Sequence, residues 1–133
     1  MGEYDIRADI PRSRLYVRIK GFFREADVAP TLNALRTEVG KLNGPFDVVM
    51  DISKFMPGSP QAADALKQGG EIVKDAGRRR AVRVTGGIVT GLMQFKRLIG
   101  GVFEEDETVR YASSVEEADS ILDRWESTAE TES

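Results

Sequence analysis

The stretch FDVVMDISKFMPGSPQAADALK, residues 46–67, decides the fold. An apolar run leads to Asp51, a loop rich in Ser, Gly and Pro follows, and apolar residues three and four positions apart begin after Ser59 and Pro60. A short apolar run is typical of a buried strand, whereas spacing of three and four is typical of an amphipathic helix. The stretch therefore predicts a strand joined directly to a helix, the unit from which α/β domains are built.

Two segments near the N-terminus alternate apolar and polar residues. In YDIRADI (4–10) and LYVRIK (15–20) every second side chain is apolar. This period is typical of strands, and the short PRSR (11–14) between them predicts an antiparallel hairpin. The same alternation in AVRV (81–84) and TVRYA (108–112) predicts a fourth and a fifth strand.

Helical spacing of apolar residues occurs four times. The predicted helices run over residues 28–42, 60–76, 88–102 and 115–125. Asp27 is the expected N-cap of the first helix and Ser59 of the second, because short polar side chains accept hydrogen bonds from the free amides of a first turn. Since helices alternate with the later strands, those strands should be parallel and joined by right-handed crossovers.

Most of the predicted strands alternate, and only DVVM (47–50) approaches a continuous apolar run. A doubly wound sheet, by contrast, is buried on both faces and has nearly continuous apolar strands. We therefore expect an α/β domain with a mixed five-stranded sheet. Its first hairpin should be antiparallel and its remaining strands parallel, with four helices mainly on one face. The second face should be polar and carry Arg18, Lys20, Asp47, Arg83 and Arg110.

Length and composition are those of one domain. The chain has 133 residues, of which 41% are hydrophobic and 31% charged, enough for a single core. Residues 1–125 should form the domain, and the polar, acidic segment 126–133 should be a disordered tail. Because the sequence has no 18-residue apolar run and no apolar signal region, we expect a cytoplasmic protein.

Two residue types that many enzymes use are absent, which leaves carboxylate, lysine, tyrosine or hard-metal chemistry. The sequence contains no histidine and no cysteine, which excludes Ser-His-Asp triads, Cys-His pairs and the usual zinc sites. Asp51 has no neighbouring carboxylates with which to hold a metal, so its carboxylate is expected to accept loop amides. We therefore predict no catalytic residue, metal or cofactor, and no enzyme. An isoelectric point near 5.1 argues against nucleic acid as a partner.

The chain resembles a known family. The order of elements, the strand DVVMDIS leading into a helix of small residues, and the closing helix EEADSILDRW resemble the STAS domain, in its SpoIIAA-like branch of anti-sigma-factor antagonists. The likeness spans residues 4–125. It implies a mixed sheet and a regulatory role exercised through protein partners.

Part of the family's signature is missing. Asp51, Ile52 and Ser53 match the Asp-Leu-Ser that ends the third strand in the antagonists. Ser59, Pro60 and Gln61 stand where the family has an aspartate and a serine pair, one serine of which takes a phosphate. The resemblance thus implies the fold without the phosphorylatable serines, and Ser59 is expected to be an ordinary helix cap.

The ends of the strands are where ligands of open parallel sheets usually bind. The segments GFFRE and SKFMPG bring large apolar side chains to this end, and we expect one of Phe55 and Met56 to pack inward and the other to contact a partner. The expected partner-binding residues are Phe22, Phe23, Asp51, Ser53, Phe55, Met56 and Ser59.

Two functions remain open for these residues. The first is an interaction module that binds a protein partner, and the second is a lipid- or small-ligand-binding domain that associates peripherally with a membrane. A homo-oligomer is compatible with either. Gly69 and Gly70 lie inside the second helix, where glycine is unfavourable, and we expect them to allow close packing of that helix on the sheet.

Overall fold

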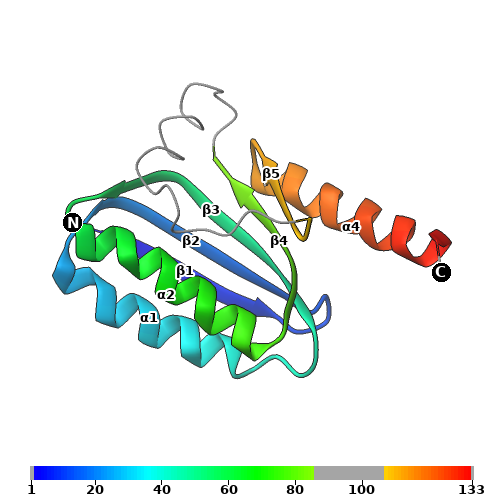
Figure 1. Ribbon diagram of the computed structural model, residues 1–133, viewed down its shortest axis with the longest axis horizontal. Helices are drawn as coiled ribbons and strands as arrows, with labels where there is room; N and C mark the ends of the chain where they lie inside the picture. Colours follow the sequence, from blue (N-terminus) through cyan, green and yellow to red (C-terminus); the bar gives the residue numbers. More distant parts are fainter. Residues whose placement is uncertain (1, 86–106, 133) are drawn as a thin grey trace.

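The computed structural model describes residues 2–85 and 107–132 (Figure 1). The elements are β1 (Glu3–Asp9), β2 (Arg14–Phe23), α1 (Glu25–Val39), β3 (Phe46–Pro57), α2 (Pro60–Ala76), β4 (Arg78–Val84), β5 (Val109–Ala112) and α4 (Val115–Glu132). The helix predicted over residues 88–102 lies outside the described residues. No helix among the described residues is long and apolar enough to cross a membrane.

The five strands form one sheet in the order β1-β2-β3-β4-β5. β1 pairs with β2 in antiparallel orientation, and all other neighbours are parallel. This confirms the predicted mixed sheet. Because strand order follows chain order, right-handed crossovers proceed in one direction and place their helices on one face. α1 and α2 accordingly lie side by side against that face (Figure 1).

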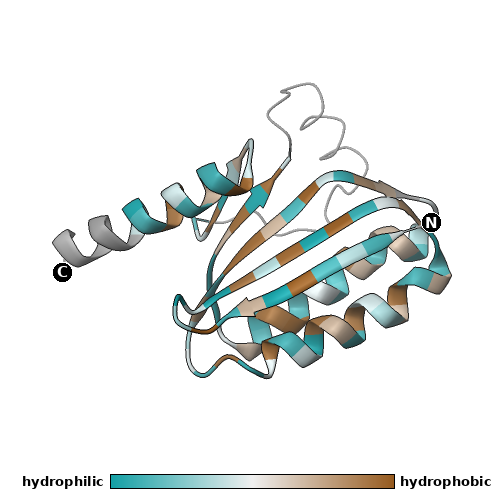
Figure 2. Ribbon diagram, turned by 180° about the vertical axis from the view of Figure 1, so that it is seen from behind, coloured by the Kyte–Doolittle hydropathy of each residue, from teal (hydrophilic) through white to brown (hydrophobic). Residues whose placement is uncertain are grey.

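α4 covers the opposite face at the β4–β5 end of the sheet. It follows the last strand, so no crossover constrains its side. Val48 and Val49 are neighbours in β3, yet Val48 belongs to the core under α1 and α2 and Val49 to a second core under α4. Seen from behind, β1, β2 and β3 lie in front of α1 and α2, and among the described helices only α4 lies on this side, toward β4 and β5 (Figure 2).

Charged groups attach α4 to the sheet. Arg14 is 3% exposed; its guanidinium donates to Asp119 Oδ1 at 2.9 Å and pairs with Asp123. The Tyr16 hydroxyl donates to the same Asp119 oxygen at 2.6 Å. Burial, together with this hydrogen bond, raises the pKa of Tyr16. A buried arginine is stable only where carboxylates compensate its charge, so α4 and β2 depend on each other.

Two residues expected on a polar face are buried. Asp47 is fully buried and accepts hydrogen bonds from Arg79 Nε at 3.2 Å and Nη2 at 3.1 Å. Arg83 is 7% exposed and donates to the Tyr111 hydroxyl at 3.1 Å. The expectation that Asp47 and Arg83 face solvent is wrong, because polar partners from neighbouring strands satisfy them inside the fold. Arg18, Lys20 and Arg110 keep accessible side chains.

Helix ends follow the expected chemistry with one change. Ser59 Oγ accepts the Ala62 amide at 3.1 Å, which confirms it as the N-cap of α2. The N-cap of α1 is Arg24 rather than Asp27, which lies in the first turn and accepts the Arg24 amide at 2.9 Å. A carboxylate at this third position caps the helix from inside. α4 continues to Glu132 and thus includes most of the segment that composition predicts to be disordered.

α1 also caps the outer edge of β1. The Gly2 amide donates to Asp27 Oδ2 at 3.3 Å, and the Ala8 amide donates to Glu38 Oε1 at 3.1 Å. Glu38 pairs in addition with Lys41. The hydrogen bonds from Lys41 and from the Ala8 amide lower the pKa of Glu38. Two carboxylates of one helix therefore hold both ends of the edge strand.

Gly69 of α2 faces α1 rather than the sheet, and Gly70 faces open space. A Cβ built on Gly69 would lie 3.4 Å from Leu35 Cδ2, whereas one built on Gly70 meets nothing within 4 Å. We expect Gly70→Ala to raise the free energy of unfolding by about 0.5–1 kcal/mol, because alanine costs less entropy in a helix. Urea denaturation measures this, with Gly69→Ala as the matched control that should gain less. A destabilised Gly70→Ala would contradict the packing described here.

The charge on Glu38 makes part of the stability depend on pH. Its pKa is lowered on folding, so its contribution is complete above the ordinary value of 4.5 and is lost as the pH falls through the lower folded value. We expect Glu38→Gln to lower the free energy of unfolding at neutral pH. The difference from the natural chain should vanish in acid, where the protonated carboxyl resembles the amide. Unfolding curves recorded across the acid range measure this difference in the free energy of unfolding. A difference that does not change with pH would refute the stabilising role of the charged Glu38 carboxylate.

Candidate functional site

β3 continues past the point where a loop was expected. It pairs with β2 as far as Pro57, opposite Phe23, so the prediction of a loop over residues 53–58 is wrong. The register changes on the way: Arg18 lies opposite Asp51, but Lys20 lies opposite Lys54, which gives β3 one extra residue. Such a bulge absorbs the irregular segment and allows pairing to resume.

Asp51 stabilises this bulge. Its Oδ1 accepts the Ser53 amide at 3.1 Å and the Ser53 hydroxyl at 2.7 Å, while Oδ2 lies 3.6 Å from Arg18 Nε. This arrangement supports the interpretation of Asp51 as an acceptor of local amides. Among the described residues no group of three or more carboxylates is placed to hold a metal ion.

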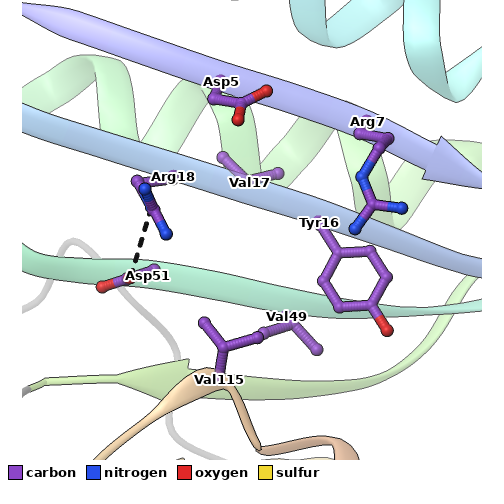
Figure 3. Close-up of a pocket in the computed structure, with 8 residues that line it drawn as sticks. All are labelled: Asp5, Arg7, Tyr16, Val17, Arg18, Val49, Asp51 and Val115. Atoms are coloured by element: carbon purple, nitrogen blue, oxygen red, sulfur yellow. Dashed lines mark ion pairs between the residues drawn. The ribbon is translucent and has the colours of Figure 1, made fainter.

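The uncovered sheet face has a shallow hollow beside Asp51. It is about 100 Å³ in volume and is bounded by β1, β2, β3 and the start of α4. Figure 3 shows Arg18 directed at Asp51, and Arg7 beside the ring of Tyr16, over which its guanidinium lies at 4.7 Å. Ligand pockets are usually several times larger, at about 300–1,000 Å³. This hollow is therefore too small to be a ligand site by itself.

The end of β3 directs successive side chains to opposite faces. Phe55 packs against the first core, with its ring 5.4 Å from that of Phe23 in an edge-to-face arrangement. Met56 points the other way and is 60% exposed. Its register partner in β2 is Phe22, which is 44% exposed. Two large apolar side chains thus lie next to each other on adjacent strands, in contact with solvent.

Two residues that the sequence analysis did not select complete this surface. The Arg24 guanidinium lies 5.7 Å from the Phe22 ring centre. The Gly58 amide donates to the Phe23 carbonyl at 2.6 Å, and a Cβ on Gly58 would lie 2.7 Å from Phe22 Cε1. We call Phe22, Arg24 and Met56 the strand-end patch. The period of two along β2 was the signal that could have placed Arg24 beside Phe22.

The seven predicted site residues do not form one surface. Phe22 and Met56 are exposed together, whereas Phe23 is 2% exposed and Phe55 packs on the core. Asp51 and Ser53 bind each other at the bulge, and Ser59 caps α2. The structure therefore leaves two of the seven as an apolar surface that a partner could contact.

The core beneath Phe55 offers little room for a ligand. A cavity of about 40 Å³ lies between the sheet, α1 and α2 and is lined mostly by apolar side chains. Ligand pockets usually have about 300–1,000 Å³, so the cavity is many times too small. A lipid chain or a metabolite does not fit it.

Comparisons with known proteins support the fold. No protein-family model and no curated protein sequence matches this chain. Among solved structures, the Bacillus cell fate determinant SpoIIAA in its phosphorylated form is 11% identical and matches with a TM-score of 0.57, covering 90% of this chain and 99% of its own. The anti-sigma factor antagonist SpoIIAA in its unphosphorylated form is 13% identical, with a TM-score of 0.56 over 90% of this chain and 96% of its own. The chain has the fold that the sequence resemblance predicted.

The cap on α2 can be tested directly. We expect Ser59→Ala to lower the free energy of unfolding by about 1 kcal/mol, because the Ala62 amide loses its acceptor. Ser59→Asp retains a capping oxygen and should keep most of that stability. Chemical denaturation of the three chains measures the difference. If the alanine variant is as stable as the natural chain, the hydroxyl is not a structural cap.

Proposed function

We propose that this chain, which shares the fold of SpoIIAA, is a non-enzymatic regulatory module that binds a protein partner through the strand-end patch. The fold supports this proposal because SpoIIAA is an anti-sigma factor antagonist, a protein that acts on other proteins. At 11–13% identity the likeness extends to the fold, so the choice of surface rests on the geometry of this chain.

The observation that carries the proposal is the exposure of Met56 beside Phe22. Folding alone favours burying such side chains, each worth about 1.5–3 kcal/mol when removed from water. Here the strand pairing holds both on the solvent side, and the fit of Gly58 against the Phe22 ring restricts that ring. A restricted ring such as that of Phe22 loses little entropy on binding, and apolar side chains that become buried on binding are typical interface anchors.

The charges around the patch favour a protein partner with carboxylates at its rim. Arg24 already lies over Phe22, and the exposed Lys54 precedes Phe55 in β3. An apolar centre with a charged rim is the usual arrangement of a protein interface. The same combination also suits the headgroups of an anionic membrane, which is why the test below contains a membrane arm.

Binding in this proposal does not depend on phosphorylation of the adjacent turn. Pro60 and Gln61 have no hydroxyl, and the oxygen of Ser59 accepts the Ala62 amide. We expect protein from its host to carry no stoichiometric phosphate on Ser53 or Ser59. Intact-mass and peptide mass spectrometry check this expectation.

The patch predicts distinct effects for neighbouring residues. We expect Met56→Ser to weaken partner binding by about tenfold or more, with little change in melting temperature, because the side chain is exposed in the free protein. Phe55→Ser should instead lower the melting temperature strongly, because that ring packs on the core. The measurement is the dissociation constant for a partner captured from the host with the natural chain, together with thermal unfolding.

Ile10 provides the matched control. It is 57% exposed and lies in the turn between β1 and β2, at the opposite end of the hairpin. Ile10→Ser should leave partner binding unchanged. Equal losses for Ile10→Ser and Met56→Ser would refute the patch. Salt-sensitive flotation of the chain with anionic vesicles, abolished by Met56→Ser, would replace the protein partner with a membrane surface.

A further inference from the structure

β1 is the outer strand of the sheet. Among residues 2–85 and 107–132 no strand pairs with its outer side. It runs for seven residues without proline, and its register with β2 is continuous from Glu3 to Asp9. A regular edge of this kind exposes a row of backbone amides and carbonyls that can pair with another strand.

At both ends of this edge an outward-pointing amide donates to a carboxylate of α1, whereas the outward amides in the middle remain available for pairing with another strand. The Ala8 amide points outward, since it donates to Glu38 of α1. Backbone direction alternates along a strand, so the groups of Tyr4 and Ile6 point outward as well. The Gly2 amide, in the same series, is taken by Asp27. Tyr4 and Ile6 therefore form a window of two residues between two carboxylate caps.

We propose that this window pairs with the same window of a second copy of the chain. The strands would run antiparallel about a two-fold axis at Asp5, with Tyr4 opposite Ile6 of the second copy and Ile6 opposite its Tyr4. The pairing satisfies the open amides and carbonyls of both copies. The strands separate beyond it, where Ala8 of one copy and Gly2 of the other keep their carboxylate acceptors. The pairing also covers the Tyr4 side chain, which is 44% exposed in the single chain.

The charges on the edge agree with this register. Glu3, Asp5 and Arg7 project from the other side of β1, on the same face as Tyr16. The two-fold axis places Glu3 of each copy opposite Arg7 of the other, at the separation of directly opposed cross-strand residues. This favourable pair therefore occurs twice. The two Asp5 carboxylates meet on the axis, each with the accessible Arg18 as its neighbour in β2.

The alternative symmetric register fits less well. An axis at Ile6 would require the Ala8 amide of each copy, which Glu38 occupies. It would bring Asp5 opposite Arg7 of the second copy, but it would also place Glu3 opposite Asp9 twice, against the single Asp5 pair of the other axis, and like charges directly opposed are unfavourable. The capped window therefore selects the axis at Asp5. With only two residues of each strand paired, the contact is far smaller than a stable interface of about 1,000 Å², so the dimer is weak and depends on concentration.

Complementary charge variants test both the contact and its register. We expect sedimentation equilibrium to show reversible dimerisation of the natural chain at high concentration. Arg7→Glu and Glu3→Lys should each weaken self-association at least tenfold, because each opposes like charges twice. An equimolar mixture of the two variants should associate again, since the introduced lysine then faces the introduced glutamate. Asp5→Asn should strengthen the natural dimer by removing the repulsion on the axis.

Hydrogen exchange provides a second readout at the backbone. Protection of the Tyr4 and Ile6 amides should rise with protein concentration, whereas the capped Ala8 amide should be protected at every concentration. A chain that stays monomeric at millimolar concentration, or variants that fail to associate when mixed although their melting temperatures are unchanged, would overturn the proposal. Met56→Ser should dimerise like the natural chain, so this test is independent of the proposed partner site.

Discussion

The parallel pairing of β2 with β3 is the contact on which the rest of this structure depends. It runs from Arg14 opposite Asp47 to Phe23 opposite Pro57 and passes through the bulge at Asp51. Its inner residues carry the two cores, one on each face of the sheet. Its far end holds Phe22 next to Met56. Without the extra residue in β3, every later side chain of that strand would point to the opposite face, because side chains alternate with a period of two.

The two faces of the sheet are stabilised by different means. α1 and α2 cover one face with apolar side chains, whereas α4 is attached to the other by a small apolar core and by the carboxylates of Asp119 and Asp123 around the buried Arg14. Removing one partner from such a buried pair leaves an uncompensated charge, which costs far more than a lost surface contact. The position of α4 therefore depends on a few charged groups, and it leaves most of β1 and β2 uncovered on that face.

Both proposed interaction surfaces lie where this architecture leaves strands incompletely covered. The strand-end patch occurs where β2 and β3 extend beyond α4 on the second face, and the edge window occurs where α1 caps only the ends of β1. In each case the backbone geometry is fixed by pairing within the sheet, so the exposed groups are presented in one arrangement. Preorganisation of this kind lowers the entropy lost on association.

Among the described residues, the sequence by itself determined where most of the strands and helices lie, that the first hairpin is antiparallel and the rest parallel, and that Ser59 caps a helix. These properties follow from local spacing and from single side chains next to the backbone they serve. Only the tertiary structure decided that α4 covers the second face, that Arg83 and Asp47 are buried, and that β3 resumes pairing after Asp51. A period of two shows which side chains share a face, but not whether a distant segment will cover that face. Burial of a charge depends on partners such as Arg79 and Tyr111, which only folding brings within hydrogen-bonding distance.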